Sequence, residues 1–367
     1  MTLPSTERIL LGPGPSVMSP RVMRAMASPV LSHLDPEFLV LMDELRARLA
    51  HVFRAPAGSL ALATSGTGTS GMETAVANLV QRGTRVLAVV SGYFGDRLAE
   101  MCARYGAEVR RLDVEWGRAV DPDDVRKALE ASPADLVCIV HAETSTGVRN
   151  PVEAVARIAH EAGALIIVDA VTSLGGMPLD VAAWELDAVY SCSQKGLGAP
   201  SGLAPVVFAP RALEKRVTCR SFYFDLSLLE DYWVRRKYHH TMSSSLVYAL
   251  AEAVAMVEEE GLEARWARHE RNHRAFVEGA SALGLSMLVP EVSRLWTLNT
   301  VKVPAGVDEA AVRRHLLQRF NIEIGAGLGP LAGQIFRIGL MGHGSTPAHV
   351  ALCLAALGDA LGRRPQA

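Results

Sequence analysis

The chain has 367 residues and a mass of 39.4 kDa, a length that suggests two or three domains. Apolar residues make up 49% and charged residues 21%, which excludes a largely disordered chain and leaves ample material for a buried core. The formal net charge is −2, so we expect neither a nucleic-acid-binding protein nor a basic membrane-surface protein.

The cysteines and the N-terminus indicate where the protein resides. The five cysteines are scattered and form no CxxC pair, which argues against a disulfide scaffold and a cysteine-rich zinc site. No uncharged apolar run is long enough for a membrane-spanning helix. Glu7, Arg8 and several prolines interrupt the region where a signal peptide would be apolar. We therefore expect a soluble cytoplasmic protein.

The N-terminal stretch, residues 1–30, holds five of the 19 prolines and shows little periodicity. We expect an extended arm that lies against another surface. A helix is predicted next over 36–52, because Leu41, Leu45 and Leu49 recur at helical spacing.

The middle of the chain, to about residue 250, alternates short apolar runs with helical patterns. The apolar runs are rich in Val and Ile and predict strands at 59–64, 85–91, 109–112, 136–141, 165–169, 188–193 and 204–209. Helices are predicted at 71–81, 95–105, 122–131 and 152–162. This alternation is typical of a mostly parallel sheet covered by helices, so we expect one large α/β domain.

The remaining residues have a different pattern. A long charged helix is predicted over about 245–283, with a break at Gly261. Strands at 295–303 and 334–338, a helix at 308–319 and a closing helix at 347–361 follow. We therefore predict three parts: an N-terminal arm at 1–30, a large α/β domain at 31–250 and a small α+β domain at 251–367.

A glycine-rich string, GTGTSG at residues 66–71, follows a predicted strand and opens a predicted helix. Amide groups at such a helix start can bind a phosphate. A nicotinamide cofactor would also need an acidic residue at the end of the next strand, but none follows before Asp96. The hydroxyl side chains favour a single phosphate monoester. The alternative is an ordinary helix start, because Ser70 and Glu73 match a capping box.

Two further side chains stand at predicted strand ends. Lys195 is one of only five lysines among 37 basic residues, and it lies among small residues and glycines, a setting that favours a lysine held in a pocket. Asp169 closes a buried strand, where a carboxylate is costly to desolvate unless it is paired. The alternative roles are a surface lysine and a structural turn carboxylate.

The sequence HERNH at residues 269–273 matches the HExxH pattern of zinc proteases, with two imidazoles one helical turn apart. Its neighbours are mostly arginines and glutamates, and no third-ligand continuation follows. We therefore expect a solvent-exposed, charged helix and no metal site.

The phosphate loop, Asp169 and Lys195 together match the needs of one cofactor. Pyridoxal phosphate requires a phosphate anchor, an acid for its ring nitrogen and an amine for its aldehyde. With these residues in place, the chain resembles the class V aminotransferases of the pyridoxal-phosphate fold-type I group, and within them the alanine–glyoxylate and serine–pyruvate aminotransferases. The likeness runs from LLGPGPS at residues 10–16 to RIGLMG at residues 337–342, nearly the whole chain.

The resemblance implies roles for particular residues. Lys195 would join the cofactor covalently, and Asp169 would pair with the pyridinium nitrogen. Further cofactor contacts are implied for the phosphate loop, the aromatic residue of GYFGDR, and two polar residues, namely Gly68, Thr69, Ser70, Phe94, Thr144 and Gln194. Many family members carry His where this chain has Thr69.

The resemblance also implies a homodimer. Tyr238 and Thr241 are similar to residues that reach across the dimer interface to the phosphate, and the arm at 1–30 would wrap the partner subunit. Arg337 is similar to the residue that holds the substrate carboxylate, for which a guanidinium fork is suited. The partners would be small amino acids and 2-keto acids.

The implied reaction is a ping-pong transamination from alanine or serine to glyoxylate or pyruvate. Lys195 would move the α-proton while Asp169 keeps the ring nitrogen protonated. A cysteine desulfurase would carry His directly before the lysine, where this chain has Gln194. Serine–glyoxylate, aminoethylphosphonate and pyridoxamine–pyruvate aminotransferases stay open as alternatives. A non-catalytic protein on this fold would have lost the lysine.

Overall fold

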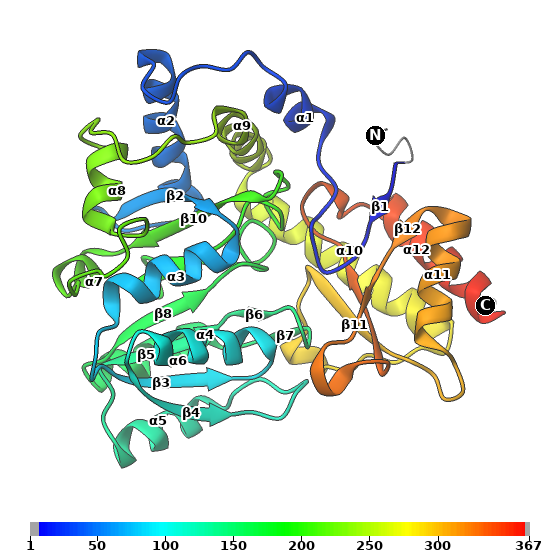
Figure 1. Ribbon diagram of the computed structural model, residues 1–367. Helices are drawn as coiled ribbons and strands as arrows, with labels where there is room; N and C mark the ends of the chain where they lie inside the picture. Colours follow the sequence, from blue (N-terminus) through cyan, green and yellow to red (C-terminus); the bar gives the residue numbers. More distant parts are fainter. Residues whose placement is uncertain (1–6, 364–367) are drawn as a thin grey trace.

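A seven-stranded sheet forms the centre of the larger part of the molecule in the computed structural model, which describes residues 7–363 (Figure 1). The strands, in their order across the sheet, are β2 (Leu60–Gly66), β10 (Gly202–Phe208), β9 (Ala188–Tyr190), β8 (Leu165–Asp169), β5 (Leu136–Val140), β3 (Arg85–Val90) and β4 (Glu108–Asp113). Only β10 runs antiparallel to its neighbours, so the carboxyl ends of the other strands meet at one edge. This confirms the predicted α/β class with a mostly parallel sheet.

Helices pack against this sheet as the alternating pattern predicts, namely α2 (Pro36–Val52), α3 (Gly68–Leu79), α4 (Tyr93–Arg104), α5 (Pro122–Ala131) and α6 (Val152–Glu161). Two further helices, α7 (Pro210–Glu214) and α8 (Leu226–Trp233), were not predicted, and α8 packs on α2. Helix α9 (Ser244–Glu260), the first part of the predicted long helix, packs on α2 and β10. Asp35 and Asp121 accept hydrogen bonds from the amides of Glu37 and Asp123, both at 2.9 Å, and each cap precedes a proline at the first helical position. These local start signals explain why α2 and α5 begin as predicted.

The smaller part contains an antiparallel sheet and three helices (Figure 1). Its sheet has the order β11 (Leu298–Lys302), β14 (Ile335–Gly339) and β13 (Gly325–Ala326). The helices are α10 (Leu262–Ala282), α11 (Glu309–Phe320) and α12 (Pro347–Leu361). A short hairpin of β6 (Ala142–Glu143) and β7 (Val148–Arg149) belongs to the larger part.

The N-terminal arm is less extended than predicted. Strand β1 (Ile9–Leu10) pairs with β12 (Ile322–Glu323), and a helix α1 (Pro20–Met26) packs on α9. The signal was present in the sequence, because Ser19 caps the amide of Arg21 and Pro20 occupies the first helical position. Residues 1–6 of the predicted arm lie outside the described residues.

Three apolar clusters form the core of the described residues. The largest surrounds the seven-stranded sheet, and the second joins Leu11 to α11, α12, β14 and the second half of α10. The third and smallest consists of Ala142, Met177, Leu295, Leu298 and Met341. The predicted break at Gly261 is confirmed, since α9 ends there and α10 begins at the next residue. The domain boundary near residue 250 stays a prediction.

Within the described residues, no helix combines the length and apolarity needed to cross a bilayer.

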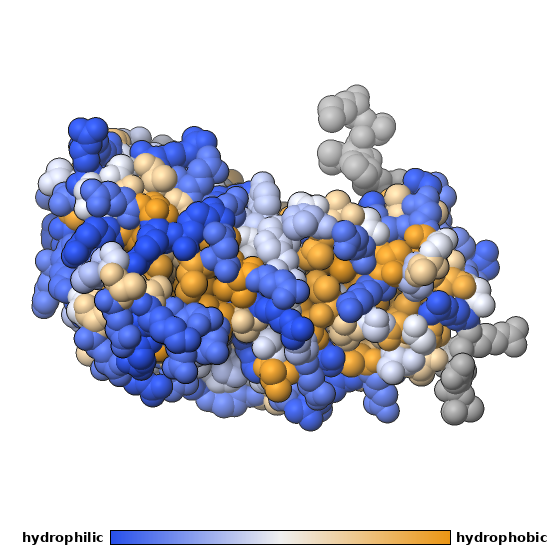
Figure 2. All heavy atoms as spheres, turned by 90° about the horizontal axis from the view of Figure 1, so that it is seen from below, coloured by the Kyte–Doolittle hydropathy of each residue, from blue (hydrophilic) through white to orange (hydrophobic). Residues whose placement is uncertain are grey.

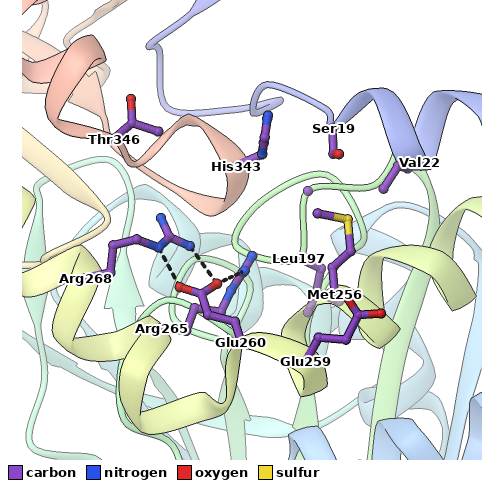
Figure 3. Close-up of a pocket in the computed structure, with 11 residues that line it drawn as sticks. Ser19, Val22, Leu197, Met256, Glu259, Glu260, Arg265, Arg268, His343 and Thr346 are labelled. Carbon is purple, nitrogen blue, oxygen red and sulfur yellow. Dashed lines mark hydrogen bonds and ion pairs between the residues drawn. The ribbon is translucent and has the colours of Figure 1, made fainter.

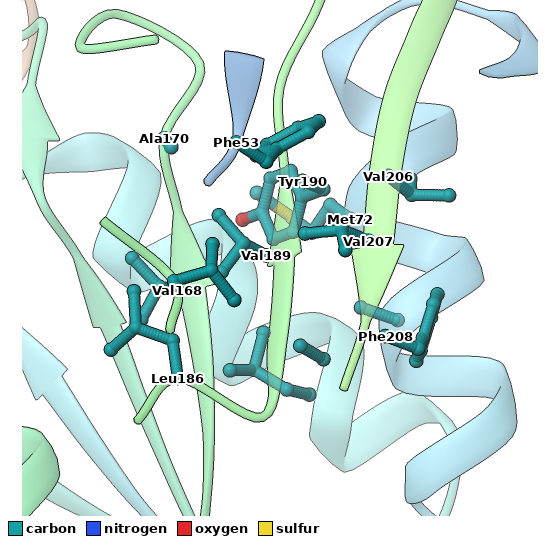
Figure 4. Close-up of a cluster of buried hydrophobic side chains, with 14 of the residues drawn as sticks. Phe53, Met72, Val168, Ala170, Leu186, Val189, Tyr190, Val206, Val207 and Phe208 are labelled. Carbon is teal, nitrogen blue, oxygen red and sulfur yellow. The ribbon is translucent and has the colours of Figure 1, made fainter. Parts of the chain in front are cut away.

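The core beneath the carboxyl edge of the sheet is dense. Figure 4 shows Tyr190 of β9 among Phe53, Met72 and Val207. These four side chains come from four different segments of the chain. Tyr190 has no solvent exposure, yet its hydroxyl donates a hydrogen bond to Asp169 Oδ2 at 2.8 Å. Apolar packing therefore holds one partner of a buried polar contact in place.

Candidate active site

A cavity of about 250 Å³ lies at the carboxyl edge of the seven-stranded sheet. Parallel α/β sheets bind ligands at this edge. Seven of the sequence-predicted site residues line the cavity, namely Gly68, Thr69, Phe94, Thr144, Asp169, Gln194 and Lys195. The structure therefore brings together residues that span 127 positions of the chain, from Gly68 to Lys195.

Lys195 lies in the turn after β9, and its amine faces the N-terminal segment. Nζ donates a hydrogen bond to the carbonyl of Pro13, and the hydroxyl of Ser16 donates to the carbonyl of Lys195 at 2.8 Å. Gly14 packs so closely that a Cβ there would come within 2.5 Å of Lys195 Cε. Burial lowers the pKa of Lys195, which favours the neutral, nucleophilic amine.

Asp169 ends β8 with its carboxylate buried and only 3% of the residue exposed. Oδ1 accepts from the amide of Val171 at 2.8 Å and Oδ2 from the hydroxyl of Tyr190 at 2.8 Å. Burial raises the pKa of Asp169 to about 7, although both hydrogen bonds oppose that rise. A cation placed beside this carboxylate would stabilise its charged form.

The glycine-rich string opens α3, as predicted. The amides of Gly68 and Thr69 lie in the first turn, where a helix leaves its N–H groups without acceptors of its own. The capping box does not form: Thr67 is the cap residue, and the hydroxyl of Ser70 donates to the Thr67 carbonyl at 2.7 Å. Glu73 accepts a hydrogen bond from the hydroxyl of Tyr105 instead. Ser70 is not among the residues that line the cavity.

Arg337 lies beside the cavity on β14, 7% exposed. Nε donates to the carbonyl of Ala326 at 2.6 Å and Nη1 to the carbonyl of Thr144 at 3.2 Å. Within residues 7–363 no carboxylate forms an ion pair with this guanidinium, and burial lowers its pKa to about 10. A buried cation without a counter-charge is costly, so this position suits an incoming carboxylate.

These residues fit pyridoxal phosphate. Gln194 Oε1 is buried in the cavity wall without a hydrogen-bond partner in the described part of the chain, so it can accept from a ligand. The α3 amides suit a phosphate, the Asp169 carboxylate suits a ring nitrogen and the Lys195 amine suits an aldehyde.

Comparisons with known proteins agree with this geometry. The family model for aminotransferase class V matches residues 16–339. The chain is 38% identical to an alanine–glyoxylate aminotransferase of Drosophila melanogaster, over 97% of this chain and 92% of that protein.

The chain belongs to the class V aminotransferases.

Two solved structures are close to it. An alanine–glyoxylate aminotransferase from Nostoc sp. has a TM-score of 0.95 and 46% identity, and the match covers 98% of both chains. A ureidoglycine–glyoxylate aminotransferase from Bacillus subtilis has a TM-score of 0.97 and 37% identity, covering 100% of this chain and 97% of that one. As a class V aminotransferase of fold type I, the protein is a pyridoxal-phosphate-dependent transaminase.

Two charged residues at or next to the cavity were not predicted from the sequence. Arg97 lines the cavity, donates to Thr69 Oγ1 at 3.2 Å and lies over the ring of Phe94 at 5.2 Å. Glu143 is fully buried and accepts from the amides of Phe94 and Gly95 at 3.2 and 3.1 Å, at the start of α4. The available signal was their position: Arg97 belongs to the GYFGDR motif, and Glu143 directly precedes Thr144, for which the resemblance implies a cofactor contact.

Two predicted residues do not reach the cavity of their own chain. Tyr238 is 63% exposed and its ring packs against His33, with 5.3 Å between centroids. Thr241 is also exposed and, like Tyr238, does not line the cavity. Their predicted contact with a phosphate therefore needs a second subunit.

The prediction for the HExxH stretch was wrong about exposure. His269 and His273 are 0% and 6% exposed, because this face of α10 packs against the loops at Gly176 and Gly342 and against Asn299 of β11. Their partners are an Arg265 carbonyl and the side chain of Asn299, both at 2.7 Å. In the part of the chain that the structure describes, no group of three or more potential ligands could hold a metal ion.

Proposed function

We propose that the protein transfers an amino group from a small amino acid, alanine or serine, to glyoxylate or pyruvate. The observation that carries this proposal is the pairing of a buried amine, Lys195, with a buried guanidinium, Arg337, that has no carboxylate partner among residues 7–363. The amine can move the proton of the substrate α-carbon, and the guanidinium can hold the substrate carboxylate. The names of two relatives, both alanine–glyoxylate aminotransferases, support this substrate class.

The cofactor would supply an aldehyde that condenses with amines and a ring that withdraws electrons. Gly68 and Thr69 would bind its phosphate through their amides, and Asp169 would hold a proton on its ring nitrogen. Phe94 would pack on the ring, while Thr144 and Gln194 would donate or accept hydrogen bonds. Ser70 would support the loop through its bond to Thr67.

Lys195 would act as the acid–base group once its amine is free. Because burial lowers the pKa of Lys195, it favours the neutral amine, the form in which Nζ can accept the α-proton of the bound amino acid. The same atom can then return the proton on the cofactor side. The carbonyl of Pro13, which accepts from Nζ, holds the amine beside the N-terminal segment.

The N-terminal segment limits the size of the substrate. Pro13 and Gly14 contact the Lys195 side chain, so a bulky side chain on a substrate that reacts beside this amine would meet them. This supports a donor with a hydrogen, methyl or hydroxymethyl side chain. Because a relative of this chain is named for ureidoglycine, that donor belongs in the test as well.

A panel of amino donors tests the substrate assignment. The purified enzyme with pyridoxal phosphate is assayed with alanine, serine, ureidoglycine, aspartate and phenylalanine against glyoxylate and pyruvate. We expect alanine or serine with glyoxylate or pyruvate to have the highest kcat/KM. A higher value for aspartate or phenylalanine would contradict the small-substrate assignment.

We further propose a homodimer with shared active sites, in which Tyr238 and Thr241 contact the phosphate bound by the partner subunit. Tyr238, Phe222 and Val30 are 63%, 70% and 76% exposed, so a partner subunit would bury apolar surface at these side chains. Figure 2 shows apolar residues gathered along the middle of one face. The arm at 1–30 would wrap the partner.

The unpaired state of all five cysteines supports a cytoplasmic location.

Subunit mixing tests the shared site. A chain with Lys195→Ala and a chain with both Tyr238→Ala and Thr241→Ala should each be nearly inactive alone. Mixed dimers contain one site with an intact Lys195 and intact partner residues, so mixing should restore activity. If mixing restores none, or if a monomer at high dilution is fully active, the sites are not shared.

A further inference from the structure

The HExxH stretch lies on a buried polar face of α10 that the proposed chemistry does not use. Arg265, Arg268, His269 and Asn272 follow the spacing i, i+3, i+4 and i+7, so they share one side of the helix. We call these four residues the α10 polar face. Their side chains bond mostly to loop atoms of both parts of the molecule.

At one end of this face, Arg265 holds the loop of the proposed catalytic lysine. Its side chain is 6% exposed. Nη2 donates to the carbonyl of Gly196, directly after Lys195, and Nε donates to the carbonyl of Gly175, both at 2.8 Å. Nη1 pairs with Glu260 at 2.6 Å, and Figure 3 shows this cluster beneath Leu197. One planar guanidinium therefore fixes two loops at the carboxyl edge of the sheet.

At the other end, Arg268 and His269 hold a loop of the smaller part. Arg268 Nη1 donates to the carbonyl of Ser345 at 2.6 Å, while Nε and Nη2 pair with Glu260. His269 Nε2 accepts from the amide of Gly342 at 3.0 Å. Asn272 donates to the hydroxyl of Ser345 at 3.1 Å. Gly342 follows β14, the strand that carries the proposed substrate arginine.

The tautomer of His269 follows from its two partners. The carbonyl of Arg265 can only accept, so Nδ1 carries the proton in the 2.7 Å contact between them. Nε2 is then the acceptor for the Gly342 amide. Burial lowers the pKa of His269 to about 3, so the ring stays neutral and keeps both bonds.

The two ends of the α10 polar face meet at the backbone of Lys195. A Cβ on Gly342 would lie 3.1 Å from the carbonyl oxygen of Lys195 and 3.2 Å from that of Gly196. The loop after β14 therefore rests directly on the lysine turn. Arg337, on the same strand, is only five residues before Gly342.

We propose that Arg265, Arg268 and His269 are positioning residues that set the place of Lys195 relative to Arg337. The inference rests on the proposed function of these two residues. Arg265 acts on the lysine through the Gly196 carbonyl. Arg268 and His269 act on the arginine through the loop at residues 342–345 that continues its strand.

Two variants separate the two ends. In Arg265→Lys, an ammonium cannot span the carbonyls of Gly175 and Gly196 as the guanidinium does. His269→Asn keeps a donor at the place of Nδ1 but loses the acceptor for Gly342, whereas His269→Gln keeps an acceptor near the place of Nε2. Arg271→Lys, on the exposed side of α10, is the matched control.

Measurements on the enzyme with bound pyridoxal phosphate report separately on the Arg265 end and the His269 end of the α10 polar face. Arg265→Lys should shift the pH at which the cofactor absorbance changes by about one unit and slow borohydride trapping, with KM for the acceptor within about threefold of wild type. His269→Asn should raise KM for donor and acceptor about tenfold, the equivalent of one hydrogen bond, and His269→Gln should recover most of that loss. Arg271→Lys should match wild type.

Three results would contradict the positioning role. Equal KM values for His269→Asn and His269→Gln, or an unshifted absorbance titration in Arg265→Lys, would overturn the positioning role. So would a uniform loss of all parameters that follows the melting temperature. The absorbance and trapping measurements need no amino acid substrate. A wild-type enzyme that binds the cofactor but transfers no amino group would therefore refute the proposed function without deciding the positioning inference, which the Arg265→Lys titration still tests.

Discussion

The cavity around Lys195 and the α10 polar face both bury charged side chains, but they satisfy them differently. In the cavity, Arg337 forms no ion pair within the described residues, and Gln194 Oε1 has no hydrogen-bond partner there. On α10, Arg265 and Arg268 share the carboxylate of Glu260 and give their remaining hydrogen bonds to backbone carbonyls. The first arrangement is incomplete without a ligand, and the second is complete within the chain.

The pKa shifts of the two regions show the same difference. Burial raises the pKa of Asp169 to about 7, because the cavity holds no cation close enough to offset the desolvation. Burial also disfavours the charged form of Glu260, but Arg268 and Arg265 hold its pKa at about 2. Buried polar groups thus mark a ligand site where they lack partners and a structural joint where they have them.

The largest effect is expected for Lys195→Ala, because it removes the amine from the cavity. Transamination should be abolished, while the α3 amides and Asp169 still allow some non-covalent cofactor binding. Borohydride treatment of the wild-type enzyme, followed by peptide mass spectrometry, should place the reduced cofactor on Lys195. A modified peptide containing any of the other four lysines would show that the site is assigned to the wrong residue.

Asp169→Asn should have the next largest effect. The change removes the carboxylate charge with little change in volume, so the ring nitrogen of the cofactor loses the group that keeps it protonated. We expect kcat to fall on the order of 10²- to 10⁴-fold, the usual range for a lost acid–base group, with the circular dichroism spectrum unchanged. Near-normal turnover would refute this role.

Arg337→Ala should mainly weaken substrate binding. A charge-assisted pair with a carboxylate contributes about 1.5–3 kcal/mol, so KM for alanine and glyoxylate should rise roughly 10- to 150-fold. Arg337→Lys should recover part of the loss, because an ammonium cannot form the two-point fork. The cofactor absorbance should not change. Unchanged KM values for both substrates in Arg337→Ala would refute the proposed clamp.

The smallest expected effect is on the free energy of unfolding. Its pH dependence has opposite signs for Glu260 beside the α10 polar face and for Asp169 of the cavity. The pKa of Glu260 is lowered from 4.5 to about 2, so its contribution is present above pH 4.5 and is lost as the pH falls toward 2. In cofactor-free protein the pKa of Asp169 is raised from 3.8 to about 7, so its contribution is present below pH 3.8 and is lost as the pH rises through 7.

Urea unfolding at a series of pH values would measure this difference. Cofactor-free Asp169→Asn should gain stability relative to wild type as the pH rises from 3.8 to 7. Glu260→Gln should be less stable than wild type above pH 4.5, and the two should converge as the pH falls toward 2. Parallel curves for both variants would contradict the contrast between the two regions.

Much of the fold could be predicted from local patterns. The bounds of α2, α5 and α12 were predicted to the residue, since a proline at the first helical position marks each start. The strands of the large sheet were predicted within three residues at each end, the largest difference being at the end of β9. Helix α1 was missed, because the many prolines of the arm concealed one more helix start at Pro20.

Part of the candidate site was predictable for a physical reason. Asp169 and Lys195 follow strands of a sheet that is mostly parallel, and the carboxyl ends of parallel strands meet at one edge. The contribution of Pro13 could not be read in this way. Its carbonyl reaches Lys195 across 182 positions of sequence, and backbone carbonyls carry no residue-specific pattern.

The sequence by itself determined the class of the sheet and the family, and it predicted most of the polar residues that line the cavity. It could do so because hydrophobic period, helix caps and spaced motifs are local properties of the chain. Tertiary structure alone decided which polar groups find partners. The charged pattern around His269 predicted a solvent-exposed helix, yet its imidazole is fully buried against the loop at Gly342. Whether a charged or polar side chain meets water, a ligand or a carbonyl depends on segments far away in the sequence, and only the folded chain brings them together.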